Sequence, residues 1–475
     1  MIKVKLNNSK FNYDVYQIIN LFYLFPEIKF VEEDYDFNIE VAEDVIKICF
    51  NAESYEYIIN KNYKIKEELK KAVFLYFSKN ATSVLPWGTL IGIRPSKRAL
   101  ERLQEGATDE TIIAEFKDKN VATADKARLC IDVAKFEQNI VNTKKENISV
   151  YIGMPFCPTR CLYCSFTSNP INSCKTVVAP YLKALSHEIE SISTYIKDKH
   201  LNIECVYFGG GTPTSVNNEQ FEGIMQSIYE SFIVGNKVKE FTVECGRPDS
   251  ITIEKLSTMK SCGVHRISIN PQTMNDDTLK LIGRDHSVDS VTEKFNMARE
   301  LGFDNINMDL IVGLPGEKIS HMIKTCHEIS KIKPDSITIH GLSIKRGSKL
   351  HESMLNNNKF EVPCQEELNE MYQQTVELSK KLHMEPYYMY RQKNMVGNME
   401  NIGYKTPGKE GIYNIQMIEE KQTIIALGAD AVCKVVFLEE NRHERFANVK
   451  DVREYVKRID EMVERKIKLL DTLYN

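Results

Sequence analysis

Three cysteines in residues 157–164 have the type and spacing to bind a metal cluster. Cys157, Cys161 and Cys164 follow the pattern Cys-x3-Cys-x2-Cys, which puts three thiols on one short loop. Three thiolates suit three irons of a [4Fe–4S] cluster and leave the fourth iron open to a reactant. Structural zinc normally has four ligands, and no second Cys-x2-Cys or paired histidines lie nearby to complete a zinc site. The spacing therefore favours an iron–sulfur cluster over zinc.

A glycine-rich turn follows the next apolar segment of the chain. Residues 203–208 are an expected strand, and they lead directly into Gly209, Gly210 and Gly211. Glycine has no Cβ, so backbone N–H and C=O groups can come close to a ligand. Taken alone, such a turn is most often a plain connection between a strand and a helix. Behind a three-cysteine loop it indicates a ligand site beside the cluster.

The cysteine loop and the glycine turn together resemble those of the radical S-adenosylmethionine (SAM) enzymes. Later segments of the chain resemble successive motifs of the oxygen-independent coproporphyrinogen III dehydrogenase family, and they are residues 241–249, 263–272, 283–284 and 307–316. Within that family, the chain resembles the HemZ-like branch. That branch has an extra amino-terminal region and stretches like residues 390–395 and 408–414, and the resemblance covers about residues 82–430.

The resemblance implies two cofactors, a [4Fe–4S] cluster on the three cysteines and SAM. In the family, the open iron binds the amino and carboxylate groups of SAM, and one electron cleaves SAM to a 5′-deoxyadenosyl radical. The cysteines are therefore expected to be both metal ligands and catalytic. Motif by motif, the residues expected to bind SAM are Tyr151, Gly210, Gly211, Thr212, Glu244, Gln272, Arg284 and Asp309. The charged ones also have a structural interpretation, as strand-end carboxylates satisfied by neighbours or as a helix-terminal cation.

The reaction implied by the resemblance is oxidative decarboxylation of two propionates of coproporphyrinogen III to vinyl groups. This would make the protein an oxidoreductase of anaerobic heme and porphyrin biosynthesis, with an electron donor such as flavodoxin or ferredoxin. Two departures leave alternatives open. Phe166 stands where the best-known dehydrogenases have a fourth cysteine, and Gly153 stands where they often have histidine. Related heme chaperones also carry the phenylalanine, so a heme chaperone and a radical SAM methylase acting on heme are alternative functions.

A substrate with four propionates calls for cations at its binding site, because guanidinium and ammonium groups pair with carboxylates. Six cations lie on loops expected near the mouth of the fold, namely Lys345, Arg346, Arg391, Lys393, Lys405 and Lys409. Charged loop residues are usually only solvated, so each is a weak candidate by itself.

The composition limits the classes of protein to which this chain can belong. A chain of 475 residues exceeds one core and predicts two or three domains, and 42% hydrophobic with 27% charged residues is typical of a globular protein. A net charge of −4 gives no bulk attraction to nucleic acid or anionic membrane. The absence of a long apolar run or of an apolar leader after Met1 predicts a cytoplasmic protein without membrane insertion. We expect a monomer with its remaining cysteines reduced.

Three domains are expected along the chain. Residues 1–145 combine alternating strand patterns at 38–41 and 45–50 with helical periodicity at 65–77 and 123–141, which predicts an α+β accessory domain. Residues 351–475 are expected to form a substrate-capping domain. It has a helix at 364–382, an apolar run at 423–429 and a charged helix at 451–470.

Between them, residues 146–350 repeat a strand, a loop and a helix, which predicts an α/β fold. Six apolar strands are expected, at 148–153, 203–208, 239–245, 265–269, 304–311 and 335–341. Six βα units predict an open, partial (β/α)6 TIM-like barrel. Ligands of such folds bind at the carboxyl ends of the strands, where the cysteine loop and the expected SAM residues fall.

Overall fold

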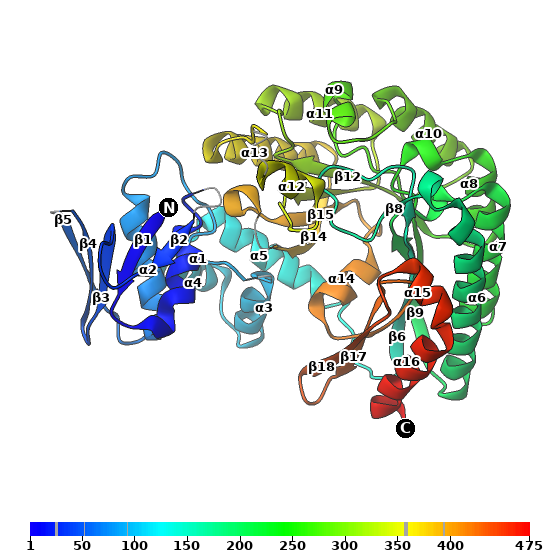
Figure 1. Cartoon of the computed structure of the whole chain (residues 1–475), viewed down its shortest axis with the longest axis horizontal. Coiled ribbons are helices and arrows are strands. Elements are labelled where there is room, and N and C mark those ends of the chain that lie inside the picture. The colour runs from blue at the N-terminus through cyan, green and yellow to red at the C-terminus, as the bar shows by residue number, and fades with distance from the viewer. Residues whose placement is uncertain (24–26, 52, 93, 356–359, 393–394) are drawn as a thin grey trace. The chain divides into compact units, whose positions relative to one another are not determined.

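The computed structural model of this chain consists of two compact units, which are described separately (Figure 1). It describes the whole chain except residues 24–26, 52, 93, 356–359 and 393–394. Unit 1 comprises Met1–Lys135, Cys364–Glu370 and Tyr390–Glu400, and unit 2 comprises Phe136–Pro363, Met371–Met389 and Asn401–Asn475. None of the helices in the described part of the chain is long and apolar enough to cross a membrane.

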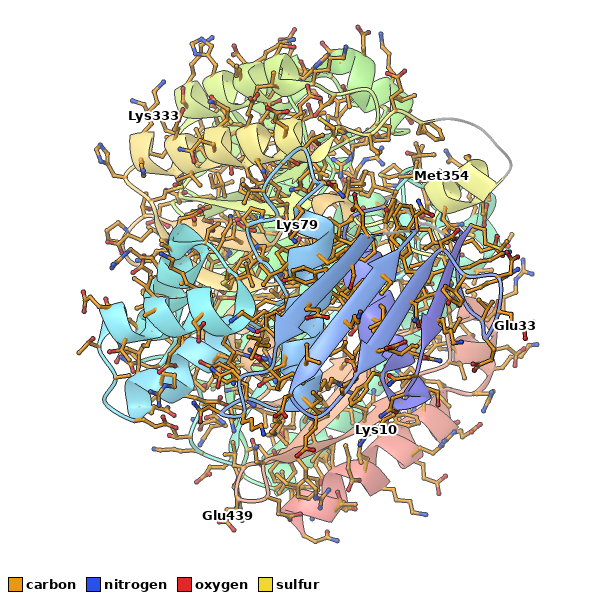
Figure 2. All side chains as sticks on the ribbon, turned by 90° about the vertical axis from the view of Figure 1, so that its left-hand side faces the viewer. Lys10, Glu33, Lys79, Lys333, Met354 and Glu439 are labelled. Carbon is orange, nitrogen blue, oxygen red and sulfur yellow. The ribbon has the colours of Figure 1, made fainter. Side chains whose placement is uncertain are left out.

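Unit 1 begins with a five-stranded sheet in the order β2-β1-β3-β4-β5. Its strands are β1 (Ile2–Leu6), β2 (Ile28–Phe30), β3 (Phe37–Val41), β4 (Val45–Phe50) and β5 (Glu53–Ile58). β1 is parallel to β2 and β3, and β4 is antiparallel to β3 and β5. Side chains alternate between the two faces of a strand, so Ile46 and Ile48 of β4 are both buried on one face. Figure 2 shows the other face, toward the viewer, with helices behind the sheet.

Helices α1 (Asn12–Ile19) and α2 (Ile65–Ser78) close the core of this sheet. Leu69, Val73 and Phe77 recur every four residues along α2, which puts them on one face of the helix, and all three are buried. Three more helices complete the main part of unit 1, α3 (Ser96–Gln104), α4 (Asp109–Asn120) and α5 (Ala124–Glu137). The strands and the first helix expected here are confirmed, whereas the expected helix at 123–141 ends at Glu137.

Unit 2 contains six parallel strands that are adjacent in one sheet. They are β6 (Asn147–Met154), β9 (Asn202–Gly210), β10 (Glu240–Glu244), β11 (Arg266–Ser268), β12 (Ile306–Val312) and β13 (Ser336–Gly341), as the sequence predicts within three residues. Helices follow the first five of these strands, and they are α6 (Lys175–Asp198), α7 (Asn218–Ile228), α8 (Ile253–Ser261), α10 (Val288–Glu300) and α11 (Ile319–Ile332). Figure 1 shows these helices in succession along the outer side of the strands.

The carboxy-terminal residues add strands at both ends of the parallel set. β15 (Asn401–Lys405) pairs antiparallel with β13, beside β14 (Glu385–Tyr390). At the other end, β16 (Thr423–Leu427) runs parallel to β6, and β17 (Val432–Phe437) and β18 (Arg442–Ala447) follow it. The remaining elements include α9 (Asp276–Leu281), α12 (Lys349–Leu355), α13 (Gln365–Lys381), α14 (Ile412–Glu419), α15 (Val452–Lys457) and α16 (Ile459–Tyr474). The expected single helix at 451–470 is therefore wrong, because Arg458 leaves helical geometry between α15 and α16.

A buried ion pair attaches the last helix to the strands. Lys466 on α16 binds the Glu188 carboxylate on α6, and both side chains are fully buried. The second oxygen of Glu188 accepts hydrogen bonds from the Gly428 N–H at 2.7 Å and the Tyr455 hydroxyl at 2.6 Å. A buried charge pair is tolerated when its remaining polar atoms are satisfied, and this pair meets that condition.

We predict that Lys466→Met destabilises unit 2 more than a change on the exposed side of the same helix. The substitution leaves Glu188 buried without a cation, at a cost of about 3–5 kcal/mol. Lys468→Met, also on α16 but exposed, is the matched control. Urea unfolding followed by circular dichroism should show a lower midpoint for Lys466→Met only, and the double variant Glu188→Gln/Lys466→Met should recover part of the loss. Equal midpoints for the two single variants would contradict the assignment.

Candidate active site

The three cysteines lie on the loop after β6, in mostly buried positions. Cys157 and Cys161 are each 8% exposed, and Cys164 is half-buried. The start of the loop is held by β7 (Phe156–Cys157), which pairs with β8 (Asn169–Pro170). The Cys164 N–H donates to the Cys161 carbonyl at 3.2 Å, so the last two cysteines lie in one tight turn. The sequence alone therefore located this loop correctly at the carboxyl end of a strand.

Each cysteine sulfur has a polar neighbour that can donate a hydrogen bond to it. Donors aimed at sulfur stabilise a thiolate more than a thiol, and such donors are typical around iron–sulfur clusters. The donor-to-sulfur distances are 3.4 Å from Thr212 Oγ1 to Cys157, 3.7 Å from Arg247 Nη1 to Cys161 and 3.9 Å from Ser168 Oγ to Cys164.

The cysteine environment fits a [4Fe–4S] cluster. Burial raises the pKa of the Cys157 thiol to about 12 and also raises the pKa of Cys164. Iron must therefore displace these protons when it binds. No three His, Cys, Asp or Glu side chains in the described part of the chain are spaced to hold one metal ion. The thiolates of a cluster bind three different irons.

The glycine turn packs directly against the cysteine loop. A Cβ on Gly211 would lie 2.5 Å from the Phe156 carbonyl oxygen and 3.0 Å from the Cys157 sulfur. Gly210 has a φ of +104°, and a Cβ there would lie 2.8 Å from the Met154 nitrogen. The sequence suggested that glycine is needed here so that a ligand can approach. The structure shows a second reason, because the cysteine loop itself leaves no room for a side chain.

Glu244 is the last residue of β10 and Asp309 lies within β12, with β11 between these strands, and the two carboxyl groups have opposite ionisation preferences. Burial and the nearby charge of Asp309 raise the pKa of Glu244 to about 8, although the Tyr207 hydroxyl donates to it. Burial also opposes ionisation of Asp309, but hydrogen bonds from His340 and Asn307 outweigh it, and the pKa of Asp309 lies below its ordinary value. At neutral pH the pair thus holds one negative charge and one proton.

Gln272 has the strained backbone that often accompanies a functional site. Its φ is +68°, which a residue with a side chain rarely adopts. The conformation is held from both sides, because the Gln272 N–H donates to the Asp309 carbonyl and the Ile311 N–H donates to the Gln272 carbonyl, each at 2.9 Å. The side chain is 6% exposed. This position therefore lies beside Asp309, and its expected contact with SAM stays a prediction.

Arg284 and Tyr151 lie at different depths of the site. Arg284 is buried, donates to the Asn270 carbonyl at 2.6 Å, and hydrogen-bonds Tyr163 and Cys161 of the cysteine loop. Tyr151 instead stacks on Tyr207, with ring centroids 6.1 Å apart. The structure thus places Arg284 against the cysteine loop and Tyr151 among aromatic rings of the strands. Whether either contacts SAM stays a prediction.

Arg247 had no predicted role, yet its guanidinium reaches the cysteine loop. It is 3% exposed and forms two parallel hydrogen bonds to Asp249, at 2.9 and 2.8 Å. Its remaining nitrogen lies 3.0 Å from Thr159 Oγ1 and 3.7 Å from the Cys161 sulfur. The sequence signal for a role of Arg247 was Asp249, two residues further along. A carboxylate at that spacing can fix a guanidinium in one orientation.

Several of the cations expected at a substrate site instead bind other groups of the protein. Arg391 is 2% exposed inside unit 1 and donates to the Asn398 carbonyl at 2.5 Å, so its expected contact with a propionate is wrong. Lys405 pairs with Glu385, and Lys409 pairs with Asp304. Lys393 lies outside the described residues. Lys345 and Arg346 are the candidates that stay near the cysteine loop.

Comparison with known proteins identifies the family of this chain. Residues 151–329 match the model of the Radical SAM superfamily. The chain is 40% identical over 391 residues to the oxygen-independent coproporphyrinogen-III oxidase-like protein HemZ of Bacillus subtilis, covering 82% of this chain and 77% of HemZ. It is 35% identical over 225 residues to the heme chaperone HemW of the same organism, covering 47% of this chain and 58% of HemW.

The fold also has a solved counterpart. The structure of coproporphyrinogen III oxidase (HemN) from Escherichia coli aligns with a TM-score of 0.54 at 20% identity, covering 69% of this chain and 72% of that chain. This chain belongs to the radical SAM superfamily and, within it, to the HemZ-like oxygen-independent coproporphyrinogen III oxidases. The resemblance drawn from the sequence is therefore confirmed, and the family implies a [4Fe–4S] cluster and SAM.

We predict that Arg247 raises the reduction potential of the cluster. A fixed cation beside a cysteine sulfur favours the more negative, reduced state, and about 1.4 kcal/mol of that preference corresponds to about 59 mV for one electron. Arg247→Met should lower the midpoint potential by about 50–100 mV on this scale. Arg247→Lys keeps the positive charge but not the two parallel hydrogen bonds to Asp249. Its midpoint potential should therefore lie between those of wild type and Arg247→Met. EPR-monitored titration measures the potential, and iron content controls for cluster loss. An unchanged potential with full iron would exclude the role.

We also predict that Glu244 makes SAM binding depend on pH. Because SAM is cationic, binding should favour the Glu244 carboxylate, but a pKa of about 8 leaves Glu244 mostly protonated at pH 7. The apparent affinity should therefore rise about tenfold between pH 7 and pH 9, as the binding-competent fraction grows. Glu244→Gln keeps the size of the side chain but cannot ionise. The variant should therefore lose the pH dependence of SAM affinity that Glu244 causes, while any pH dependence from SAM itself persists. Identical pH profiles for both proteins would contradict the prediction.

Proposed function

We propose that this protein oxidatively decarboxylates coproporphyrinogen III to protoporphyrinogen IX. The supporting observation is the cysteine loop, which can leave one iron open and packs against the glycine turn, whose Gly209 adjoins the Glu244 carboxylate. Asp309, within the parallel strand β12, is near enough to raise the pKa of Glu244. Likeness to HemZ over most of the chain favours this substrate. When bound, the cluster and SAM would supply a radical that takes a β-hydrogen from a propionate. Loss of CO2, with one electron passing to an external one-electron acceptor, would then leave a vinyl group.

The charges of the site are arranged to hold a cationic cofactor next to an anionic cluster. Arg247 and Arg284 contact the loop that carries the thiolates. Asp309 supplies a negative charge for the cationic groups of SAM, and Glu244 supplies a second once it loses its proton. Opposite charges at short range in a poorly solvated site orient a ligand strongly.

An exposed ring beside the cysteines could receive the tetrapyrrole. Phe166 is 67% exposed, although large apolar side chains are usually covered. The Lys345 ammonium lies 5.6 Å from the centre of this ring. Arg160 of the same loop donates to the Gly347 carbonyl at 2.5 Å, which ties the segment of Lys345 to the cysteine loop. A ring to stack on and a cation for a propionate thus adjoin the cluster.

The heme chaperone function is the second candidate. It is favoured by likeness to HemW and by Phe166 at the position of the fourth cysteine. The two functions differ in their products, since a chaperone binds heme and releases no CO2. No feature of the described residues favours a methylase acting on heme.

Anaerobic product analysis separates these candidates. Cluster-loaded protein is incubated with coproporphyrinogen III, SAM and a one-electron reductant. The proposal predicts vinyl product, CO2 and 5′-deoxyadenosine. Tight heme binding without any CO2, in protein with an intact cluster, would favour the chaperone and refute the decarboxylase.

We predict that Phe166→Ala and Lys345→Gln uncouple SAM cleavage from decarboxylation. Loss of a charged hydrogen bond costs about 1.5–3 kcal/mol, so vinyl formation by Lys345→Gln should fall about ten- to a hundredfold. Release of 5′-deoxyadenosine should continue, because neither residue contacts the expected SAM residues. Lys349→Gln, an exposed lysine four residues further on, is the matched control. Normal vinyl yields in both test variants would remove these residues from the substrate site.

A further inference from the structure

Unit 1 contains a cationic cavity that the proposed reaction does not use. The cavity has a volume of about 450 Å³ and lies between the start of α2, the segment at 89–98 and the end of α4. This volume is in the range of small-molecule sites, which span about 300–1,000 Å³. Its cationic lining residues are Lys64, Lys66, Lys70, Arg94 and Arg98.

The lining carries a strong excess of positive charge. Glu67 is the one carboxylate among the lining residues, so five cations and one anion leave a net charge of +4. Asp14, outside the lining, binds Lys66 at 3.1 Å and Lys70 at 3.0 Å, and Glu67 is shared with Lys119 at 3.3 Å. Arg94 has an interaction partner of its own, so leaving Arg94 out and counting Asp14 gives an excess of two. Like charges repel, so their concentration around one cavity favours an anionic ligand.

The backbone at the start of α2 adds to this preference. α2 is 14 residues long, and no side chain caps its amino-terminal end at Lys64. The first N–H groups of a helix lack partners inside the helix, and the helix dipole places partial positive charge there, so such an end suits a phosphate group.

The cavity also has apolar lining residues. These are Leu90, Ile91 and Pro95, in the same segment as Arg94 and Arg98. A ligand that fits both kinds of residue combines clustered negative charges with a flat or apolar group. A nucleotide has this form, whereas the carboxylates of a tetrapyrrole are spread around its rim. We propose that unit 1 binds a nucleoside di- or triphosphate, a role separate from the proposed chemistry of unit 2.

Calorimetric titration of the cluster-loaded full-length protein tests this proposal. ADP, ATP, pyrophosphate and coproporphyrin III are the probes, with SAM at saturation so that the expected adenosine site of unit 2 is occupied. ATP should bind with one-to-one stoichiometry and pyrophosphate should compete. The affinity should weaken as salt concentration rises, because exposed charges are screened.

Two double variants with the same loss of charge decide where ATP binds. Lys64→Gln/Arg98→Gln removes two lining cations and should weaken ATP binding about tenfold or more. Lys10→Gln/Lys79→Gln removes two cations outside the lining and should leave binding unchanged. Lys79, labelled in Figure 2, follows the far end of α2. The rise per residue of a helix puts it about 20 Å from Lys64 along the helix.

Three outcomes would overturn the proposal. These are no binding of ATP or pyrophosphate, equal weakening in both double variants, and binding of coproporphyrin without nucleotide. Circular dichroism and a second test variant, Lys64→Gln alone, separate loss of binding from loss of folding. Because the proposed decarboxylation is measured by vinyl product, either proposal can fail without the other.

Discussion

The close packing of the glycine turn against the cysteine loop is the constraint on which the site depends. The Gly211 N–H donates to the Met154 carbonyl at 2.6 Å, and the Thr212 N–H donates to the Phe156 carbonyl at 2.7 Å. These bonds join the end of β9 to the loop after β6 with no space for a side chain between them. Cys157 is thereby fixed next to Thr212, and the rest of the loop continues from that point. Two neighbouring parallel strands thus determine where an iron can bind.

Around this contact, charge is separated by sign. Arg247 and Arg284 lie against the cysteine loop, where thiolates need cations. Glu244 at the end of β10 and Asp309 within β12 supply the anions that a cationic cofactor needs. The proton that Glu244 retains at neutral pH avoids two adjacent buried negative charges before that cofactor binds. The same residues therefore limit charge repulsion within the protein and supply negative charge for a cation.

Much of this arrangement could be predicted from the sequence, because local patterns determine it. The cysteine spacing, the glycine turn and the apolar runs located the loop, the turn and all six parallel strands. Contacts between distant segments could not be predicted in this way. Arg247 reaches Cys161 across 86 residues, and Lys466 binds Glu188 across 278 residues. Arg391 was misassigned for the same reason, since nothing local shows that its guanidinium binds backbone carbonyls inside unit 1. The close packing of Gly210 and Gly211 could not be predicted either, because it depends on contacts with a neighbouring strand and its loop.

The most direct test of this account is the cluster content of Gly211→Ala. Its Cβ would approach the Phe156 carbonyl and the Cys157 sulfur, whereas a Cβ on Gly223 of α7 meets no atom within 4 Å, so Gly223→Ala is the matched control. Iron and sulfide analysis after anaerobic reconstitution, with EPR of the reduced protein, measures the cluster. We predict that wild type and Gly223→Ala hold a full, SAM-responsive [4Fe–4S] cluster, and that Gly211→Ala keeps its secondary structure but loses most of its iron. A full cluster with an unchanged EPR response to SAM in Gly211→Ala would contradict the account.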